Sequence, residues 1–216
     1  EWGWGTGVEP PQIHVTLDTQ ERHERLEGET AHGKGKAAAS FASADLGAMA
    51  PAFSGTDSHG KSWSLAGLKG KVVVLETTNV DCPYVRKHYT SGNMQAQQRE
   101  AAAKGAVWLS LVASGPGMEG YVEGLEANEI TRRRDAHPAA VLLDPQGTIA
   151  RAYGATVTPH MFVIDARGIL VYKGGIDSIR SSNPDDVPRA KQYVRAALEE
   201  VLAGNKVTEA STRPYG

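Results

Sequence analysis

Cysteine is the scarcest residue in this sequence, because Cys82 is the only one among 216 residues. A single thiol excludes an internal disulfide framework and a cysteine-rich zinc site, and it leaves the redox compartment open. The chain also lacks an apolar run of roughly 18 residues, the length that a membrane-spanning helix needs. An excess of one charge is missing too, since 23 Lys and Arg oppose 25 Asp and Glu for a formal net charge of -2. Nucleic acid and anionic membranes are therefore not favoured, and a small molecule or another protein is the expected partner.

Residues 1–45 keep neither a helical nor a strand period, and they are rich in Gly and charged side chains. This composition cannot build a core and is typical of a disordered leader. Alternatively, Trp2 and Trp4 anchor the segment on the globular part or on a second polypeptide, because large aromatic side chains dominate such contacts. We expect a partner-docking tail over 1–45, one globular domain over 46–205 and a C-terminal tail over 206–216.

The rest of the chain alternates between strand and helix patterns, with an N-terminal β-hairpin first. This order predicts an α/β fold with a mixed sheet and helices on both faces. In sequence order, the predicted elements are the hairpin with its turn at 57–60, a helical turn, a strand at 71–77, a helix at 83–104 broken near Ser91 and Gly92, a strand at 106–114, a helix at 122–134, a strand at 139–144, two hairpin strands at 160–165 and 169–174, and a helix at 188–203.

Cys82 lies where a predicted strand ends and a predicted helix begins, within "VVVLETTNVDCPYVRKHY". Free backbone N–H groups and the positive end of the helix dipole favour thiolate over thiol at such a position. Arg86, one turn further on, is expected to lean back toward the sulfur, and Lys87 and His88 to add positive potential. The alternative is that Cys82 is a small buried hydrophobic residue without a chemical role.

Three motifs in a fixed order, "CPYVRKHY", "AVLLDP" and "AYGATVTPHMFVID", carry a family resemblance. On these motifs the chain resembles the thioredoxin-fold redoxins, specifically the peroxiredoxin-like, AhpC/TSA-related group. The resemblance implies a thioredoxin-like fold in which Cys82 matches the first cysteine of a Cys-x-x-Cys pair. It also implies that Thr158 and Pro159 form a cis-proline loop that faces Cys82 and positions the backbone of a partner.

The sequence departs from the parent families at four positions. Val85 stands where thioredoxin has its second cysteine, and Asp81 stands where thioredoxin has tryptophan. Leu75 and Asn79 stand where peroxiredoxins have the proline and threonine of their own motif. The resemblance therefore implies neither a local disulfide nor hydrogen peroxide reduction.

Three functions remain open at this point. In the first, a single-cysteine thiol oxidoreductase, Cys82 attacks a disulfide or takes oxygen from a peroxide, and an external thiol resolves the product. In the second, the chain is a non-catalytic accessory subunit of a larger assembly. In the third, Cys82 and His160 handle copper. No cofactor is indicated.

Similar proteins are often exported and the chain begins at Glu1, so we expect a periplasmic or otherwise exported protein, with the cytoplasm as the alternative.

Overall fold

The computed structural model describes residues 44–216, and the structural statements below concern this part of the chain. The predictions for Trp2 and Trp4, and for most of the segment 1–45, lie outside it. They stay predictions.

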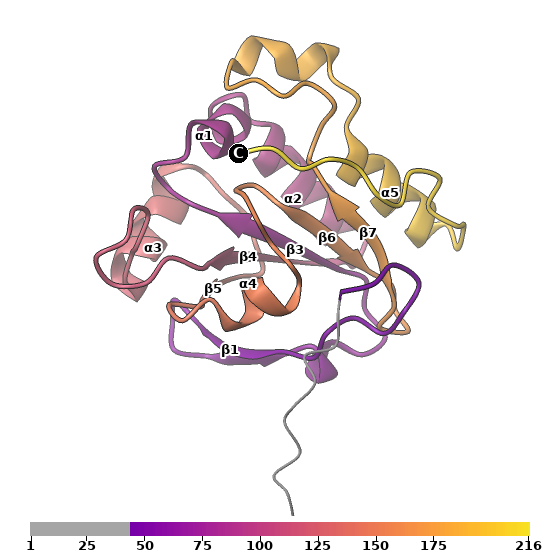
Figure 1. Ribbon diagram of the computed structural model, residues 1–216, viewed down its shortest axis with the longest axis horizontal. Helices are drawn as coiled ribbons and strands as arrows, with labels where there is room; N and C mark the ends of the chain where they lie inside the picture. Colours follow the sequence, from indigo (N-terminus) through magenta and orange to yellow (C-terminus); the bar gives the residue numbers. More distant parts are fainter. Residues whose placement is uncertain (1–43) are drawn as a thin grey trace, which may run out of the picture. The chain divides into compact units, whose positions relative to one another are not determined.

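The described part is built on one seven-stranded sheet with the strand order β2-β1-β5-β4-β3-β6-β7 (Figure 1). The central strands β3, β4 and β5 are parallel to one another, whereas β6 and β7 on one side and β1 and β2 on the other pair antiparallel. The sheet is therefore mixed, as predicted. The strands are β1 (Ser54–Asp57), β2 (Ser62–Ser64), β3 (Val73–Thr78), β4 (Val107–Val112), β5 (Ala140–Leu143), β6 (Met161–Ile164) and β7 (Leu170–Gly174).

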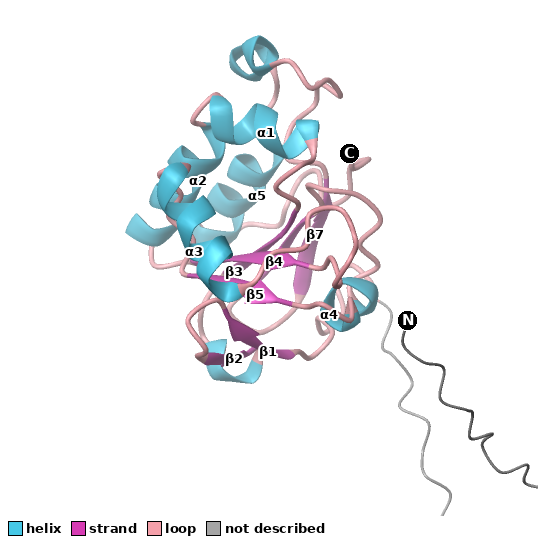
Figure 2. Cartoon of the chain, turned by 90° about the vertical axis from the view of Figure 1, so that its left-hand side faces the viewer, coloured by secondary structure: helices cyan, strands magenta, loops and turns pink. Residues whose placement is uncertain are grey.

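Helices cover both faces of the sheet, which confirms the prediction, but they do so unequally (Figure 2). Helices α1, α2, α3 and α5 lie on one face, and the short α4 lies on the other with the chain that leads into β1. The helices are α1 (Pro83–Thr90), α2 (Asn93–Ala103), α3 (Gly124–Arg133), α4 (Thr148–Ala152) and α5 (Tyr193–Leu202), with 3-10 helices η1 (Ala66–Leu68) and η2 (Pro184–Arg189).

The inner strands β3, β4, β5 and β6 are largely apolar on both sides, so each face of the sheet has its own core. Val74 pairs with Trp108 across β3 and β4, and both pack in the cluster that includes Val194 of α5. Leu75 and Leu109, one residue further along each strand, point the other way into the cluster under α4. This double burial explains why the strand patterns show little alternation.

The predicted break in the first long helix is present. Gly92 has a φ of 75°, a left-handed conformation that glycine adopts without steric cost, and α1 ends and α2 begins around it.

Two helix predictions were wrong in detail. Residues 148–152 form α4, a helix that is absent from the predicted elements, and the last helix begins at Tyr193 instead of residue 188. The 3-10 helix η2 ends at Arg189, and residues 190–192 separate it from α5. It contains Pro188, which has no N–H for an α-helical hydrogen bond.

After α5 the chain returns to the sheet. Ser211 forms a parallel bridge with Lys173 of β7, and Thr212 N donates to Lys173 O at 3.2 Å. The chain then runs to the N-terminal end of α1 (Figure 1). We call residues 210–216 the C-terminal strap.

Within residues 44–216, no helix is long and apolar enough to cross a membrane. The exported location stays a prediction.

Candidate active site around Cys82

Cys82 is the N-cap residue of α1, as predicted. The turn between β3 and α1 is shaped by Asn79, whose Oδ1 accepts a hydrogen bond from Asp81 N at 2.8 Å and whose carbonyl accepts one from Cys82 N at 3.3 Å. Pro83 occupies the first helical position, where its missing N–H is not needed. The turn therefore places the thiol at the positive end of α1.

The Thr158-Pro159 peptide bond is cis, and its loop faces Cys82. Cys82 Sγ donates a hydrogen bond to Thr158 O at 3.1 Å, although the two residues are 76 positions apart. Thr77 of β3 fixes the loop, since its Oγ1 accepts from His160 N at 2.8 Å. The close approach of Cys82 to the cis-proline loop, which the resemblance implied, is present. The hydroxyl of Thr77, which sequence reasoning did not single out, holds this loop in place.

The contact between Cys82 Sγ and Thr158 O is a hydrogen bond only while the sulfur carries a proton, because a carbonyl oxygen can only accept. Cys82 is 8% exposed and packs against the core cluster beneath α1. A nucleophilic attack needs the thiolate, and the thiolate cannot donate to Thr158 O. Reaction therefore requires that this hydrogen bond be given up.

Lys87 does not supply the positive potential that was expected of it. Its Nζ lies 3.0 Å from Asp177 Oδ2 within a fully buried ion pair, and it also donates to Ile179 O at 2.7 Å and to Tyr215 OH at 3.0 Å. A buried ammonium requires such partners. The charge of Lys87 is therefore neutralised locally.

His88 adds no charge either. Burial lowers the pKa of His88 to about 4, so its ring is neutral near pH 7. Asn93 Nδ2 lies 2.9 Å from His88 Nδ1 and Tyr215 OH lies 3.1 Å from His88 Nε2, which fits an acceptor at Nδ1 and a donor at Nε2.

Arg86 is exposed, and its side chain forms no hydrogen bond or ion pair with residues 44–216. Its proposed role beside the sulfur stays a prediction.

A comparison with known protein families matches residues 46–173 to one family. The chain belongs to the AhpC/TSA family. Membership confirms the resemblance read from the three motifs, and it supports a thiol redox role. No curated protein matches this sequence.

Solved structures share the fold of this AhpC/TSA protein. A hypothetical protein from Sinorhizobium meliloti 1021 is 22% identical, with 80% of this chain and 92% of that chain covered at a TM-score of 0.67. An uncharacterized conserved protein from Geobacillus kaustophilus is also 22% identical, with 79% and 89% covered at a TM-score of 0.68. A candidate protein disulfide isomerase from Bacteroides thetaiotaomicron is 20% identical, with 74% and 91% covered at a TM-score of 0.54. These likenesses show the fold alone, and they confirm the thioredoxin-like assignment.

The departures from the parent families have visible structural roles here. Val85, at the place of a second thioredoxin cysteine, is completely buried in the core beneath α1. Leu75 is completely buried on the opposite face of the sheet. Asn79 shapes the turn before Cys82 and donates from Nδ2 to Glu119 O at 3.3 Å. Cys82 is the only cysteine among these 216 residues, so they contain no resolving thiol.

Glu76, a fully buried carboxylate in β3, was missed by sequence reasoning. Its oxygens accept hydrogen bonds from Trp108 Nε1 at 2.8 Å, Ser110 Oγ at 2.9 Å and Tyr89 OH at 3.0 Å. Burial raises the pKa of Glu76, and these three hydrogen bonds oppose the rise. The available signal was one acidic residue inside the apolar run "VVVLET".

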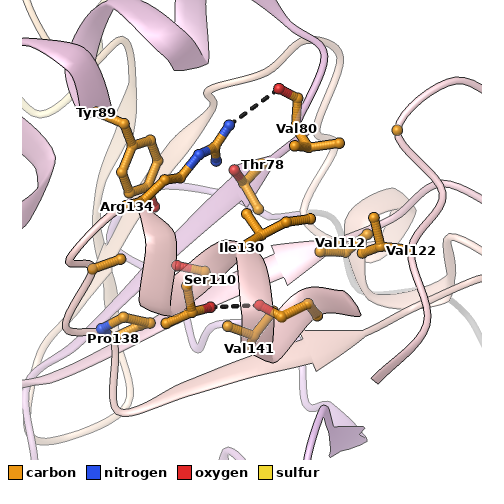
Figure 3. A pocket seen from close by; sticks show the side chains of 14 residues that line it. Thr78, Val80, Tyr89, Ser110, Val112, Val122, Ile130, Arg134, Pro138 and Val141 are labelled. Atoms are coloured by element: carbon orange, nitrogen blue, oxygen red, sulfur yellow. Dashed lines mark hydrogen bonds between the residues drawn. The ribbon is translucent and has the colours of Figure 1, made fainter. Parts of the chain in front are cut away.

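A small cavity of about 40 Å³ lies between α3 and the sheet, beside this carboxylate network (Figure 3). Arg134 lies at its edge, with its guanidinium carbon 4.5 Å from the centre of the Tyr89 ring and Nη2 donating to Val80 O at 3.1 Å. The remaining wall is largely apolar. A space of this size holds only a few water molecules, so it is a packing feature and not a substrate site.

The copper hypothesis gains no support from the position of His160. Its Nδ1 accepts from Thr156 N at 3.4 Å, and its ring stacks on Phe162 at 4.5 Å between centroids. Phe162 belongs to the core on the α4 side of the sheet, whereas Cys82 belongs to the core on the other side. No group of three His, Cys, Asp or Glu side chains suited to a metal ion occurs in the described part of the chain.

Proposed function

We propose that this AhpC/TSA protein is a one-cysteine thiol redox protein in which Cys82 is the reacting group. The observation that carries the proposal is the position of Cys82 Sγ, at the positive end of α1 and 3.1 Å from Thr158 O of the cis-proline loop. Family membership supports the same chemistry. Val85 leaves no local partner thiol, so the cycle depends on an external one.

The reaction begins when the thiol of Cys82 loses its proton and its hydrogen bond to Thr158 O. With a disulfide R–S–S–R, the thiolate forms a new S–S bond to one sulfur and the other leaves as R–S⁻. With a hydroperoxide, the thiolate takes the terminal oxygen, and the sulfenic acid and an alcohol result once a proton is supplied. An external thiol then exchanges with the mixed disulfide and releases Cys82. The sulfenic acid needs two external thiols, because the first forms a mixed disulfide with loss of water and the second releases Cys82 from it.

An accessory role without catalysis is the second candidate. The observation that favours it is the low accessibility of the thiol, since Cys82 is 8% exposed and hydrogen-bonded. A buried free cysteine is often only a small hydrophobic residue.

Treatment of the reduced, folded protein with cystamine, followed by intact-mass measurement, separates the two candidates. The redox proposal expects one mixed disulfide at Cys82 that an added thiol reverses, and no adduct in Cys82→Ser. Urea-unfolded protein serves as the control for full thiol accessibility. A folded protein that stays unmodified while the unfolded chain reacts completely would favour the accessory role and refute the redox proposal.

A further inference from the structure

The C-terminal strap is tied to the rest of the fold along its length. Thr212 Oγ1 lies 2.6 Å from Tyr172 OH and accepts from Gly175 N at 3.0 Å. Tyr84 of α1 packs edge-on against Tyr215, with 5.6 Å between the ring centroids. The strap therefore joins the β7 edge of the sheet to the first turn of α1.

Tyr215 is the main anchor of the strap. Its hydroxyl accepts from Lys87 Nζ at 3.0 Å, contacts His88 Nε2 at 3.1 Å and donates to Asp177 Oδ1. Lys87, His88 and Asp177 are buried, and Tyr215 itself is 6% exposed. Hydrogen bonds to buried charged groups are among the stronger ones in proteins, so the end of the strap has a defined position.

This anchor places Gly216 directly on the cis-proline loop. A methyl group on the Gly216 Cα would lie 2.1 Å from Thr158 O and 2.8 Å from Thr158 N, closer than any side chain can approach. Only a residue without Cβ fits there. Cys82 Sγ hydrogen-bonds the same carbonyl oxygen, so Gly216 and the thiol share one backbone group.

We propose that the C-terminal strap restricts Cys82 to small oxidants, namely low-molecular-weight disulfides and hydroperoxides, and excludes polypeptide disulfides. This inference rests on the proposed redox function. The resemblance implied that Thr158 and Pro159 position a partner's backbone, but Gly216 of the same chain already lies against the backbone of Thr158. A disulfide within a polypeptide brings extended chain on both sides of each sulfur, and that chain needs the surface that the strap covers. A small disulfide exchanges with the Cys82 thiolate by forming one S–S bond and releasing one thiolate, without displacing the strap.

Two variants release the strap in independent ways. Tyr215→Ala removes the anchor, whereas Gly216→Ala keeps the anchor and forces the end of the strap away from Thr158 O. Arg213→Ala is the matched control, because Arg213 is exposed in the same strap. Unfolding in urea reports whether each variant is folded, and Gly216→Ala keeps the test valid if Tyr215→Ala is not.

The experiment measures mixed-disulfide formation by each protein with cystamine and with insulin. Both releasing variants are expected to raise the rate with insulin about tenfold, which corresponds to about 1.4 kcal/mol, and to change the rate with cystamine far less. Arg213→Ala is expected to match the wild type with both reagents. A wild type that reacts with insulin as fast as the folded releasing variants would overturn the inference and leave the redox function intact. Absence of reaction with cystamine in every folded variant would refute the redox function and this inference with it.

Discussion

Asp177 holds the buried network beneath the site together, and its removal has a predictable cost. Its side chain accepts hydrogen bonds from Lys87 Nζ at 3.0 Å, from Ile179 N at 3.1 Å and from Tyr215 OH, with no exposed side-chain surface on either member of the ion pair. Asp177→Ala leaves the ammonium of Lys87 buried without a counter-charge. Removing one partner of a buried ion pair costs about 3–5 kcal/mol, so we expect a loss of this size in the free energy of unfolding.

Urea unfolding at pH 7, followed by tryptophan fluorescence, measures this loss. Glu199→Ala is the control, because Glu199 pairs with Lys104 at 3.6 Å on the surface, where removal of an ion pair costs less than about 1 kcal/mol. The double variant Lys87→Met/Asp177→Leu is expected to recover part of the loss, since it removes both buried charges. A loss below about 1 kcal/mol for Asp177→Ala, or a double variant less stable than the single one, would refute the reasoning.

Three further predictions concern the polar groups around the site. Burial lowers the pKa values of His88 and His160 to about 4 in the folded protein, so the unfolded chain binds protons first as the pH falls. The free energy of unfolding therefore falls as the pH drops from about 6.5 to about 4, and the loss between pH 7 and pH 5 is about 2 kcal/mol per histidine. His88→Gln should flatten the curve of unfolding free energy against pH. Thr77→Val leaves the His160 N–H without its acceptor and should lower the unfolding free energy by about 1–3 kcal/mol in urea titrations, whereas an unchanged midpoint would show that the hydroxyl does not hold the loop. Glu76→Gln places an amide N–H donor among the donors that now bond the carboxylate, so it should destabilise the protein and shift the fluorescence of Trp108. An unaltered emission spectrum would contradict the hydrogen bond from the Trp108 indole to Glu76.

The element order could be predicted from the sequence because each signal is local. Apolar runs marked β3, β4 and β5, and Gly92 marked the break between α1 and α2. Cys82 at a helix N-terminus followed from the strand, turn and Pro83 on either side of it. The cis form of the Thr158-Pro159 bond came from the family resemblance, because the trans form is otherwise the commoner one.

The tertiary structure alone decided what each polar side chain near the thiol does. In the sequence Lys87 and His88 look like sources of positive charge beside Cys82. In the fold Lys87 pairs with Asp177, 90 residues away, and bonds Tyr215, 128 residues away, while burial keeps His88 neutral. The charge of a buried group depends on its desolvation and its partners, and neither is encoded within a few residues of it. Periodicity and turn residues determine local elements, whereas the chemistry of this site depends on which distant segments meet there.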